Sequence, residues 1–220
     1  MPGVTISAAY GCGGAIVAPA VAEQLGMPLL DRAISSAVAS QLHVTLQEAE
    51  GAELKRSLVG RFFSVLAPLA GGVLGAGTDA APPDADLGWD DADTFREQAE
   101  RLMKEAISTG AVILGRGGTA ALRNEPSVLR VRLFGDVERR IAQGAIVEGV
   151  DESTARARQP EVDAARRLYF RKLYHDDIDQ LTYYHLQLDS TVLPLATCAD
   201  IIVTAYRALV PPAGDPPSPR

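Results

Sequence analysis

A glycine-rich turn between a short strand and a helix is the feature that most narrows what this chain can fold into. Residues 4–6 are all β-branched and are typical of a strand, and Gly11-Cys12-Gly13-Gly14 follows shortly after. Apolar residues then recur at helical spacing up to Gly26, which predicts a helix over 13–25. Such a turn exposes backbone N–H groups at a helix start, where the helix dipole favours an anion. The order predicts a phosphate-binding corner, although a plain tight connection has the same pattern.

Short apolar segments alternate with helical ones along most of the chain. Residues 111–114 form a continuous apolar run, which is typical of a central strand in a parallel sheet. Residues 128–134 alternate apolar residues with two arginines, which places this strand nearer a sheet edge. Further strands are predicted at 28–30 and 186–189. Further helices are predicted at 33–42, from Thr45, at 95–107 and at 136–142, with one or two more over 151–174 and either a strand or a helix end at 200–203. The alternation predicts an α/β domain with a parallel sheet covered on both faces.

Two segments break this pattern. Residues 68–93 contain five glycines, two adjacent prolines and six aspartates, which predicts a flexible insert. The insert is either a plain surface loop or a loop that closes over a ligand. Residues 211–220 contain five prolines and are predicted to be disordered. We expect residues 1–210 to form a single domain.

Charge and composition exclude several classes of function. The net charge is −7, which argues against a nonspecific grip on nucleic acid or on an anionic membrane. No apolar run reaches the roughly 18 residues that a membrane span needs. The two cysteines, Cys12 and Cys198, are too far apart in sequence and too few for a disulfide framework or a metal motif. We therefore expect a cytoplasmic protein.

Three segments that follow predicted strands carry glycine, arginine or aspartate: residues 7–14, 115–118 and 189–191. Ligands of parallel sheets bind at the carboxyl ends of the strands, so these segments are expected to converge on one crevice. Arg116 would offer a bidentate fork to a phosphate there, or would form a surface salt bridge. Asp163 lies three and four residues before Arg166 and Arg167, close enough on a helix to hold one of them. A solvated charged helix face is the simpler interpretation of that cluster.

The order of these segments resembles the cytidylate kinase-like family, a branch of the P-loop nucleoside monophosphate kinases. The matching stretches are Ile6-Ser7 with Tyr10-Gly11-Cys12-Gly13-Gly14, Leu25 to Asp31, Val112-Ile113-Leu114-Gly115-Arg116, Val128-Leu129-Arg130-Val131, Val162-Asp163 with Arg166 and Tyr169, and Leu188-Asp189-Ser190-Thr191. The resemblance implies a three-layer P-loop NTPase-like fold with a parallel sheet, helices on both faces and a small helical lid, here residues 151–175.

The resemblance also implies a reaction and a set of site residues. The reaction would be phosphoryl transfer from ATP, with Mg²⁺, to a nucleoside monophosphate such as CMP or dCMP. The donor phosphates would contact Tyr10, Gly11, Cys12, Gly13 and Gly14. The acceptor would contact Asp31, Arg116, Arg158 and Tyr169. Catalytic roles would fall to Asp163, Arg166 and Arg171, and no residue is assigned as a metal ligand. Phosphoryl transfer suits such a site because it needs positioning and charge neutralisation.

The glycine loop departs from the standard pattern G-x-x-x-x-G-K-[ST]. Aligned on Gly13, the first glycine falls at Ala8, the lysine at Gly14 and the hydroxyl residue at Ala15. Members of the resembled branch usually carry arginines beside the loop, at the positions of Ala8 and Ala15. Three interpretations follow: an active kinase, a catalytically weak relative that binds a nucleotide or phosphate as a sensor or assembly partner, and a dimeric structural protein with a vestigial crevice. The sequence leaves a homodimer open.

Overall fold

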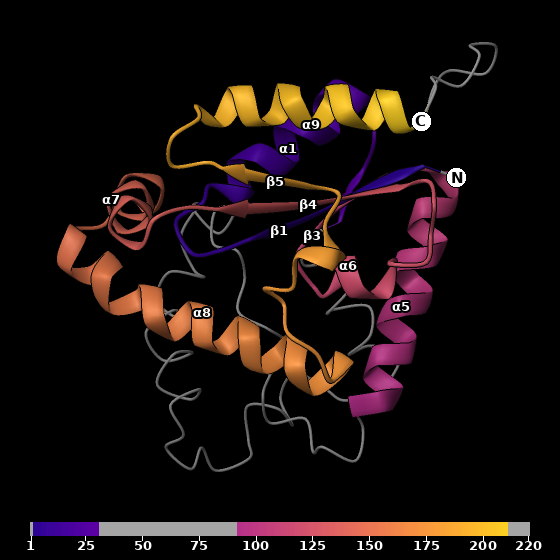
Figure 1. Cartoon of the computed structure of the whole chain (residues 1–220), viewed down its shortest axis with the longest axis horizontal. Helices are drawn as coiled ribbons and strands as arrows, with labels where there is room; N and C mark the ends of the chain where they lie inside the picture. Colours follow the sequence, from indigo (N-terminus) through magenta and orange to yellow (C-terminus); the bar gives the residue numbers. More distant parts are fainter. Residues whose placement is uncertain (1, 31–91, 211–220) are drawn as a thin grey trace.

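The structure is a computed structural model that describes residues 2–30 and 92–210 (Figure 1). Its strands are β1 (Gly3–Ala8), β2 (Leu29–Leu30), β3 (Ala111–Leu114), β4 (Val128–Phe134) and β5 (Leu186–Asp189). Its helices are α1 (Gly14–Leu25), α5 (Ala92–Thr109), α6 (Gly118–Ala121), α7 (Val137–Glu148), α8 (Glu152–Tyr174) and α9 (Leu195–Leu209), with a 3₁₀ turn, η3, at Leu181–Tyr183. Asp31, the helices expected at 33–42 and from Thr45, most of the 68–93 insert and the tail 211–220 lie outside the described residues.

The five strands form one parallel sheet in the order β2-β3-β1-β4-β5. The strand before the glycine loop is therefore central: Thr5 of β1 is in register with Ile113 on one side and with Arg130 on the other. Non-consecutive neighbours require crossover connections, which the intervening helices provide. The predicted α/β class with a parallel sheet is confirmed, and the predicted strands at 4–6, 28–30, 111–114 and 186–189 are all present.

Helices cover both faces of the sheet. Figure 1 shows α1 and α9 together on one face, with α5, α6 and α8 on the other. Helix α7 lies beyond the carboxyl ends of the strands and packs against α8. This arrangement places the glycine loop, α7 and the middle of α8 at one end of the sheet.

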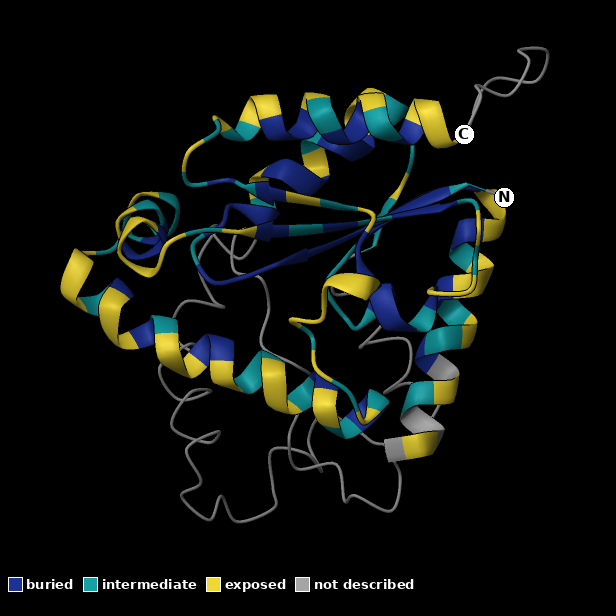
Figure 2. Ribbon diagram, in the orientation of Figure 1, coloured by how far each residue is buried: buried dark blue, intermediate teal, exposed yellow. Residues whose placement is uncertain are grey.

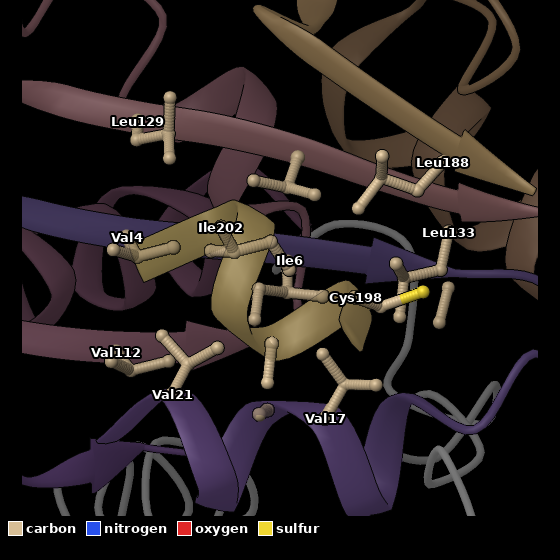
Figure 3. Packing of buried hydrophobic residues seen from close by; sticks show 14 of the residues in the cluster. Val4, Ile6, Val17, Val21, Val112, Leu129, Leu133, Leu188, Cys198 and Ile202 are labelled. Carbon is tan, nitrogen blue, oxygen red and sulfur yellow. The ribbon is translucent and has the colours of Figure 1, made fainter. Parts of the chain in front are cut away.

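The larger hydrophobic cluster fills the layer between the sheet and the pair α1 and α9. Val4 and Ile6 of β1 are fully buried there, facing Val17 of α1 and Ile202 of α9 (Figure 3). Figure 2 shows how far each residue is buried: β1 is buried, and exposed residues lie on the outer sides of α8 and α9. Because both faces of β1 are buried, the position of its carboxyl end is fixed, and the glycine loop begins there.

The structure changes two sequence predictions and decides a third that the sequence left open. Residues 200–203 lie inside α9 and form no strand; Ile202 and Val203 point into the core at helical spacing. The helix predicted at 136–142 continues to Glu148 and ends at Gly149 in the left-handed conformation, with Asp136 as its N-cap. Residues 152–174 form one uninterrupted helix.

The prediction that 128–134 lies nearer an edge than 111–114 is wrong. Strand β4 pairs with both β1 and β5, so it is second from its edge, as β3 is on the other side. Its alternation has another cause: Arg130 and Arg132 are half-buried and satisfied inside the protein. Arg130 donates to the carbonyls of Tyr183 and Arg123, at 2.9 and 3.0 Å.

Within residues 2–30 and 92–210, no helix is both long and apolar enough to cross a membrane.

Candidate functional site

The glycine loop connects the end of β1 to the first residue of α1. Gly11 and Gly13 have φ angles of 73° and 68°, in the left-handed region that favours glycine, and Gly13 is the N-cap of α1. Because the first amides of a helix have no intrahelical acceptor, this end of α1 presents N–H groups to the end of the sheet. These amides suit the oxygens of a phosphate.

The three segments expected to converge on one crevice lie at the same edge of the sheet, but the cavity described below is lined by no residue of 115–118 or 189–191. The hydroxyl of Ser190, after β5, donates to the carbonyl of Cys12 at 2.8 Å. The amide of Gly115, after β3, donates to the carbonyl of Ile6 at 2.9 Å. The glycine loop thus lies between the 189–191 and 115–118 segments, at the carboxyl ends of the strands.

Neighbouring elements lie against the loop at two glycines, with backbone at Gly11 and a side chain at Gly13. A Cβ atom on Gly11 would lie 1.9 Å from the carbonyl oxygen of Arg140 in α7. A Cβ atom on Gly13 would lie 2.6 Å from the side chain of Leu195 in α9. In addition, the amide of Gln143 donates to the carbonyl of Gly11 at 2.8 Å. The loop conformation is therefore set by α7 and α9 as well as by its own glycines.

Asp163 of α8 holds the loop to the rest of the site. Its carboxylate accepts from the backbone amide of Tyr10 at 2.9 Å and from the Arg140 guanidinium at 2.7 Å. The side-chain amide of Gln159 donates to the same carboxylate at 2.8 Å. Arg140 in turn donates to the carbonyls of Tyr10 and Gly135. Both members of the pair are buried, with side-chain exposures of 8% for Arg140 and 10% for Asp163.

The ionised form of Asp163 is favoured by these partners. Burial acts to raise the pKa of its carboxyl, but the Tyr10 amide and the Arg140 guanidinium outweigh burial and lower the pKa below its ordinary value. A buried carboxylate that keeps its charge must be matched by fixed donors, and here one of those donors is the loop itself.

A cavity of about 180 Å³ opens beside this pair, at the carboxyl ends of β1 and β4. Its lining includes four arginines and two aspartates: Arg132, Arg140, Arg166, Arg167, Asp163 and Asp179. Arg166 reaches toward the loop, and its guanidinium donates to the carbonyl of Ala8 at 2.8 Å. The cavity is a small cationic space directly next to the glycine loop.

Two of the predicted acceptor residues lie together on the far side of the loop. Arg116, in the left-handed region at φ 57°, is close enough to the Tyr169 ring to act on its hydroxyl electrostatically. Burial raises the pKa of Tyr169 to about 12, and the positive charge of Arg116 opposes that rise. The 115–118 turn is packed under α8, since a Cβ on Gly117 would lie 2.3 Å from the Tyr174 ring.

Arg158, a third predicted acceptor residue, is engaged in a structural cluster. Its guanidinium forms a 2.7 Å ion pair with Glu148 of α7, and the Tyr10 hydroxyl donates to the same carboxylate at 3.1 Å. Burial, followed by the charge of Glu148, raises the pKa of Tyr10. These contacts join α7, α8 and the loop. Because the Arg158 guanidinium is paired with Glu148 in this structure, its role in binding the acceptor remains a prediction.

The predicted catalytic residues fall in different places. Asp163 and Arg166 line the cavity, but their side chains are 3.9 Å apart, and the strong partner of Asp163 is Arg140 instead. Arg171 is exposed and is not among the lining residues. The sequence reasoning missed Arg140, Gln143 and Asp179. One sequence feature could have indicated that Arg140 is buried: it precedes Ile141 and lies four residues before Gly144, on the buried side of α7.

In the described part of the chain, no group of three or more metal-ligating side chains is close enough to hold a metal ion. Residue 15, where the standard loop carries the hydroxyl that contacts Mg²⁺, is alanine. The loop amides fit the phosphates of a nucleotide, whereas the described residues offer no dedicated ligand for magnesium.

Comparison with known proteins points to one family. The sequence matches the cytidylate kinase-like family over residues 3–192. No curated protein matches the chain. Among solved structures, an uncharacterized protein from Eubacterium ventriosum is similar with a TM-score of 0.64 and 20% identity, covering 94% of this chain and 98% of that one. A gluconokinase from Sinorhizobium meliloti is similar with a TM-score of 0.50 and 15% identity, covering 94% and 93%. At these identities the structural likeness shows the fold alone.

Proposed function

The chain belongs to the cytidylate kinase-like family and has the fold of the nucleotide-binding P-loop kinases, and from this premise we propose that it transfers a phosphoryl group from ATP to a nucleoside monophosphate. CMP or dCMP is the proposed acceptor. The observation that carries the proposal is the glycine loop itself, held at the carboxyl end of the central strand with the start of α1 behind it.

In this proposal the chain's own residues bind and orient the phosphates. Residues Tyr10 to Gly14 lie around the donor phosphates, and glycine amides of the loop donate to them. The Tyr10 amide donates to Asp163 and the Cys12 amide to the Ala9 carbonyl, so these two amides hold the shape of the loop. Arg166 neutralises charge on the transferring group from the cavity side, with Arg171 added if α8 moves as part of a lid. Arg116 and Tyr169 face the acceptor from the other side of the loop. Magnesium would arrive with the nucleotide, held by phosphate oxygens and water, as is usual for this ion.

A weaker catalyst is the second candidate, and a specific observation favours it. Ala8, Gly14 and Ala15 leave the loop with no cationic side chain and no hydroxyl for magnesium. Backbone amides suffice for ground-state binding, but preorganised charge matters most as the bond breaks. This candidate binds nucleotide and turns it over slowly or not at all, acting as a sensor or an assembly partner. A homodimer and a cytoplasmic location remain predictions.

The test is a coupled ADP-release assay of the purified full chain with ATP and magnesium, run separately with CMP, dCMP, UMP and AMP. Detection of the diphosphate product separates phosphoryl transfer from plain ATP hydrolysis. The proposal expects ADP release that depends on CMP or dCMP and exceeds the release seen with UMP and AMP. Nucleotide binding without acceptor-dependent release would favour the second candidate.

A further inference from the structure

The cavity beside the loop is positively charged although the whole chain is acidic. Its lining has four arginines against two aspartates, a formal excess of two positive charges, whereas the net charge of the chain is −7. Such a local reversal of charge inside a concave, partly enclosed space concentrates small anions. The donors are guanidinium groups, which match the oxygens of a phosphate in pairs.

Arg132 is one of three arginines in this set to which the sequence resemblance assigns no role, and it is the one that comes from the sheet. It comes from β4, its side chain is only 12% exposed, and its guanidinium lies 5.9 Å from the centre of the Tyr184 ring. Its Nη1 donates to the hydroxyl of Ser7 at 2.8 Å. Ser7 lies in β1, directly before Ala8, where the resembled branch carries an arginine. The Ala8 side chain itself packs on the other face of the sheet, with α1 and α9, so Arg132 is held beside the entry to the glycine loop and not at the position of Ala8.

The Asp179 carboxylate accepts a hydrogen bond from the other terminal nitrogen of the Arg132 guanidinium. This carboxylate lies 2.7 Å from Nη2 of Arg132 and is 52% exposed, on the segment that follows α8. Arg132 is thus a largely enclosed cation held by two partners, while Asp179 is a solvent-accessible anion on a connecting segment. A carboxylate on a guanidinium fork occupies the place that a phosphate group would take.

We propose that this cavity is a phosphate subsite in which Arg132 is the fixed cation that binds the phosphate, and in which Asp179 is the internal anion that a ligand phosphate displaces. The identification of that ligand as a nucleotide rests on the proposed function. The subsite itself is defined by phosphate chemistry and is tested without a nucleotide. If a phosphate displaces Asp179, substitutions at the two residues change the phosphate affinity in opposite directions. Removing Arg132 weakens phosphate binding, and neutralising Asp179 strengthens it.

Calorimetric titration of the full chain with pyrophosphate, and separately with ATP, tests this directly. Asp179→Asn should bind pyrophosphate roughly tenfold more tightly than wild type, because a competing charged hydrogen bond is removed. Arg132→Met should bind it at least roughly tenfold more weakly. Asp200→Asn and Arg207→Met are matched controls, since they make the same charge changes on α9, on the opposite face of the sheet, and should leave the affinity unchanged.

A double variant sharpens the test. If Asp179 acts through Arg132, then Asp179→Asn should have little effect in the Arg132→Met background, a clear departure from additivity. If Arg132→Met does not fold, the exposed Asp179→Asn substitution decides alone. Equal pyrophosphate affinity for wild type and Asp179→Asn, or equal gains for Asp179→Asn and Asp200→Asn, would overturn the proposal.

The outcomes also separate this inference from the proposed function. If ATP binds but neither variant alters its affinity or that of pyrophosphate, the subsite is wrong and the nucleotide site stands. If pyrophosphate binds with the expected dependence on both residues while ATP does not bind, the subsite stands and the proposed function fails.

Discussion

The carboxylate of Asp163 accepts a hydrogen bond of 2.9 Å from the backbone amide of Tyr10, a residue 153 positions earlier in the chain. This contact fastens the start of the glycine loop to the middle of α8. The Arg140 guanidinium, bound to the same carboxylate and to the carbonyl of Tyr10, closes the arrangement from α7. The conformation of the phosphate-binding loop therefore depends on two helices that follow it by more than a hundred residues.

Removing the Asp163 carboxylate should cost both stability and loop order. Asp163→Ala leaves the buried Arg140 charge and the Tyr10 amide without their shared acceptor, so we expect a loss of about 3–5 kcal/mol in the free energy of unfolding. Urea denaturation measures this loss. The control is Arg156→Ala, which breaks only exposed ion pairs with Glu138 and Glu152 and should change little. Similar losses for the two variants would contradict the role given to Asp163.

The contribution of Asp163 should also depend on pH in one direction. Its folded-state pKa lies below the ordinary value of about 3.9, so its stabilising effect is fully present above that pH. It is lost as the pH falls through the lower, folded-state value, because the folded protein then takes up the proton. The difference in unfolding free energy between wild type and Asp163→Ala should be constant near neutrality and shrink in acid. A difference that grows on acidification would contradict the assignment.

Two glycines with nearly the same backbone angle allow a matched test of the loop. Gly11 and Gly26 have φ angles of 73° and 64°, but only a Cβ on Gly11 meets another atom, at 1.9 Å from the Arg140 carbonyl; around Gly26 the described surroundings are open. Gly26→Ala should cost roughly 1–2 kcal/mol for the left-handed conformation alone. Gly11→Ala should cost a further ~1–3 kcal/mol from overpacking. Thermal or urea unfolding of both variants gives the comparison, and equal costs would show that α7 does not constrain the loop.

Much of the fold could be predicted because its signals are local. The β-branched run at 4–6, the apolar run at 111–114 and the Asp136 cap each act within a few residues. The arginines of β4 misled the prediction, since alternation is normally a mark of a solvated face. Here Arg132 is satisfied by Ser7 of the neighbouring strand and by Asp179, and neither partner is adjacent in sequence.

The site was predictable only in part, for the same reason. The glycine loop and the convergence of three strand ends follow from order along the chain. The partner of Asp163 does not: helical spacing pointed to Arg166 and Arg167, which are near in sequence, whereas the structure supplies Arg140 from another helix. Asp31 lies outside the described residues, so its expected acceptor role remains a prediction.

Arg116 is expected to contact the phosphate of the acceptor. Arg116→Ala should therefore weaken CMP binding by roughly 1.5–3 kcal/mol, the range for a hydrogen bond to a charged group. Calorimetry measures the affinity, and Arg207→Ala on α9 serves as the control of equal charge. Unchanged CMP affinity in Arg116→Ala, in a protein that binds CMP, would remove this residue from the site.

Restoring the missing loop cation should raise turnover. Gly14→Lys places an amine where the standard loop carries one, and that charge stabilises the β- and γ-phosphates as the bond breaks. We expect a higher kcat with little change in ATP affinity, while Gly14→Met, of similar length and without charge, should give no gain. If wild type already reaches the ~1–100 s⁻¹ typical of kinases, the loop cations are dispensable here and other arginines already replace them.

The binding of ATP to the wild-type chain is the measurement that tests the central claim most directly. Calorimetric titration should show saturable binding of one ATP per chain at sub-millimolar concentration, weakened strongly in Gly11→Ala and only slightly in Gly26→Ala. Absence of any nucleotide binding at millimolar concentration would contradict the account, and the crevice at the end of the sheet would then belong to a structural protein.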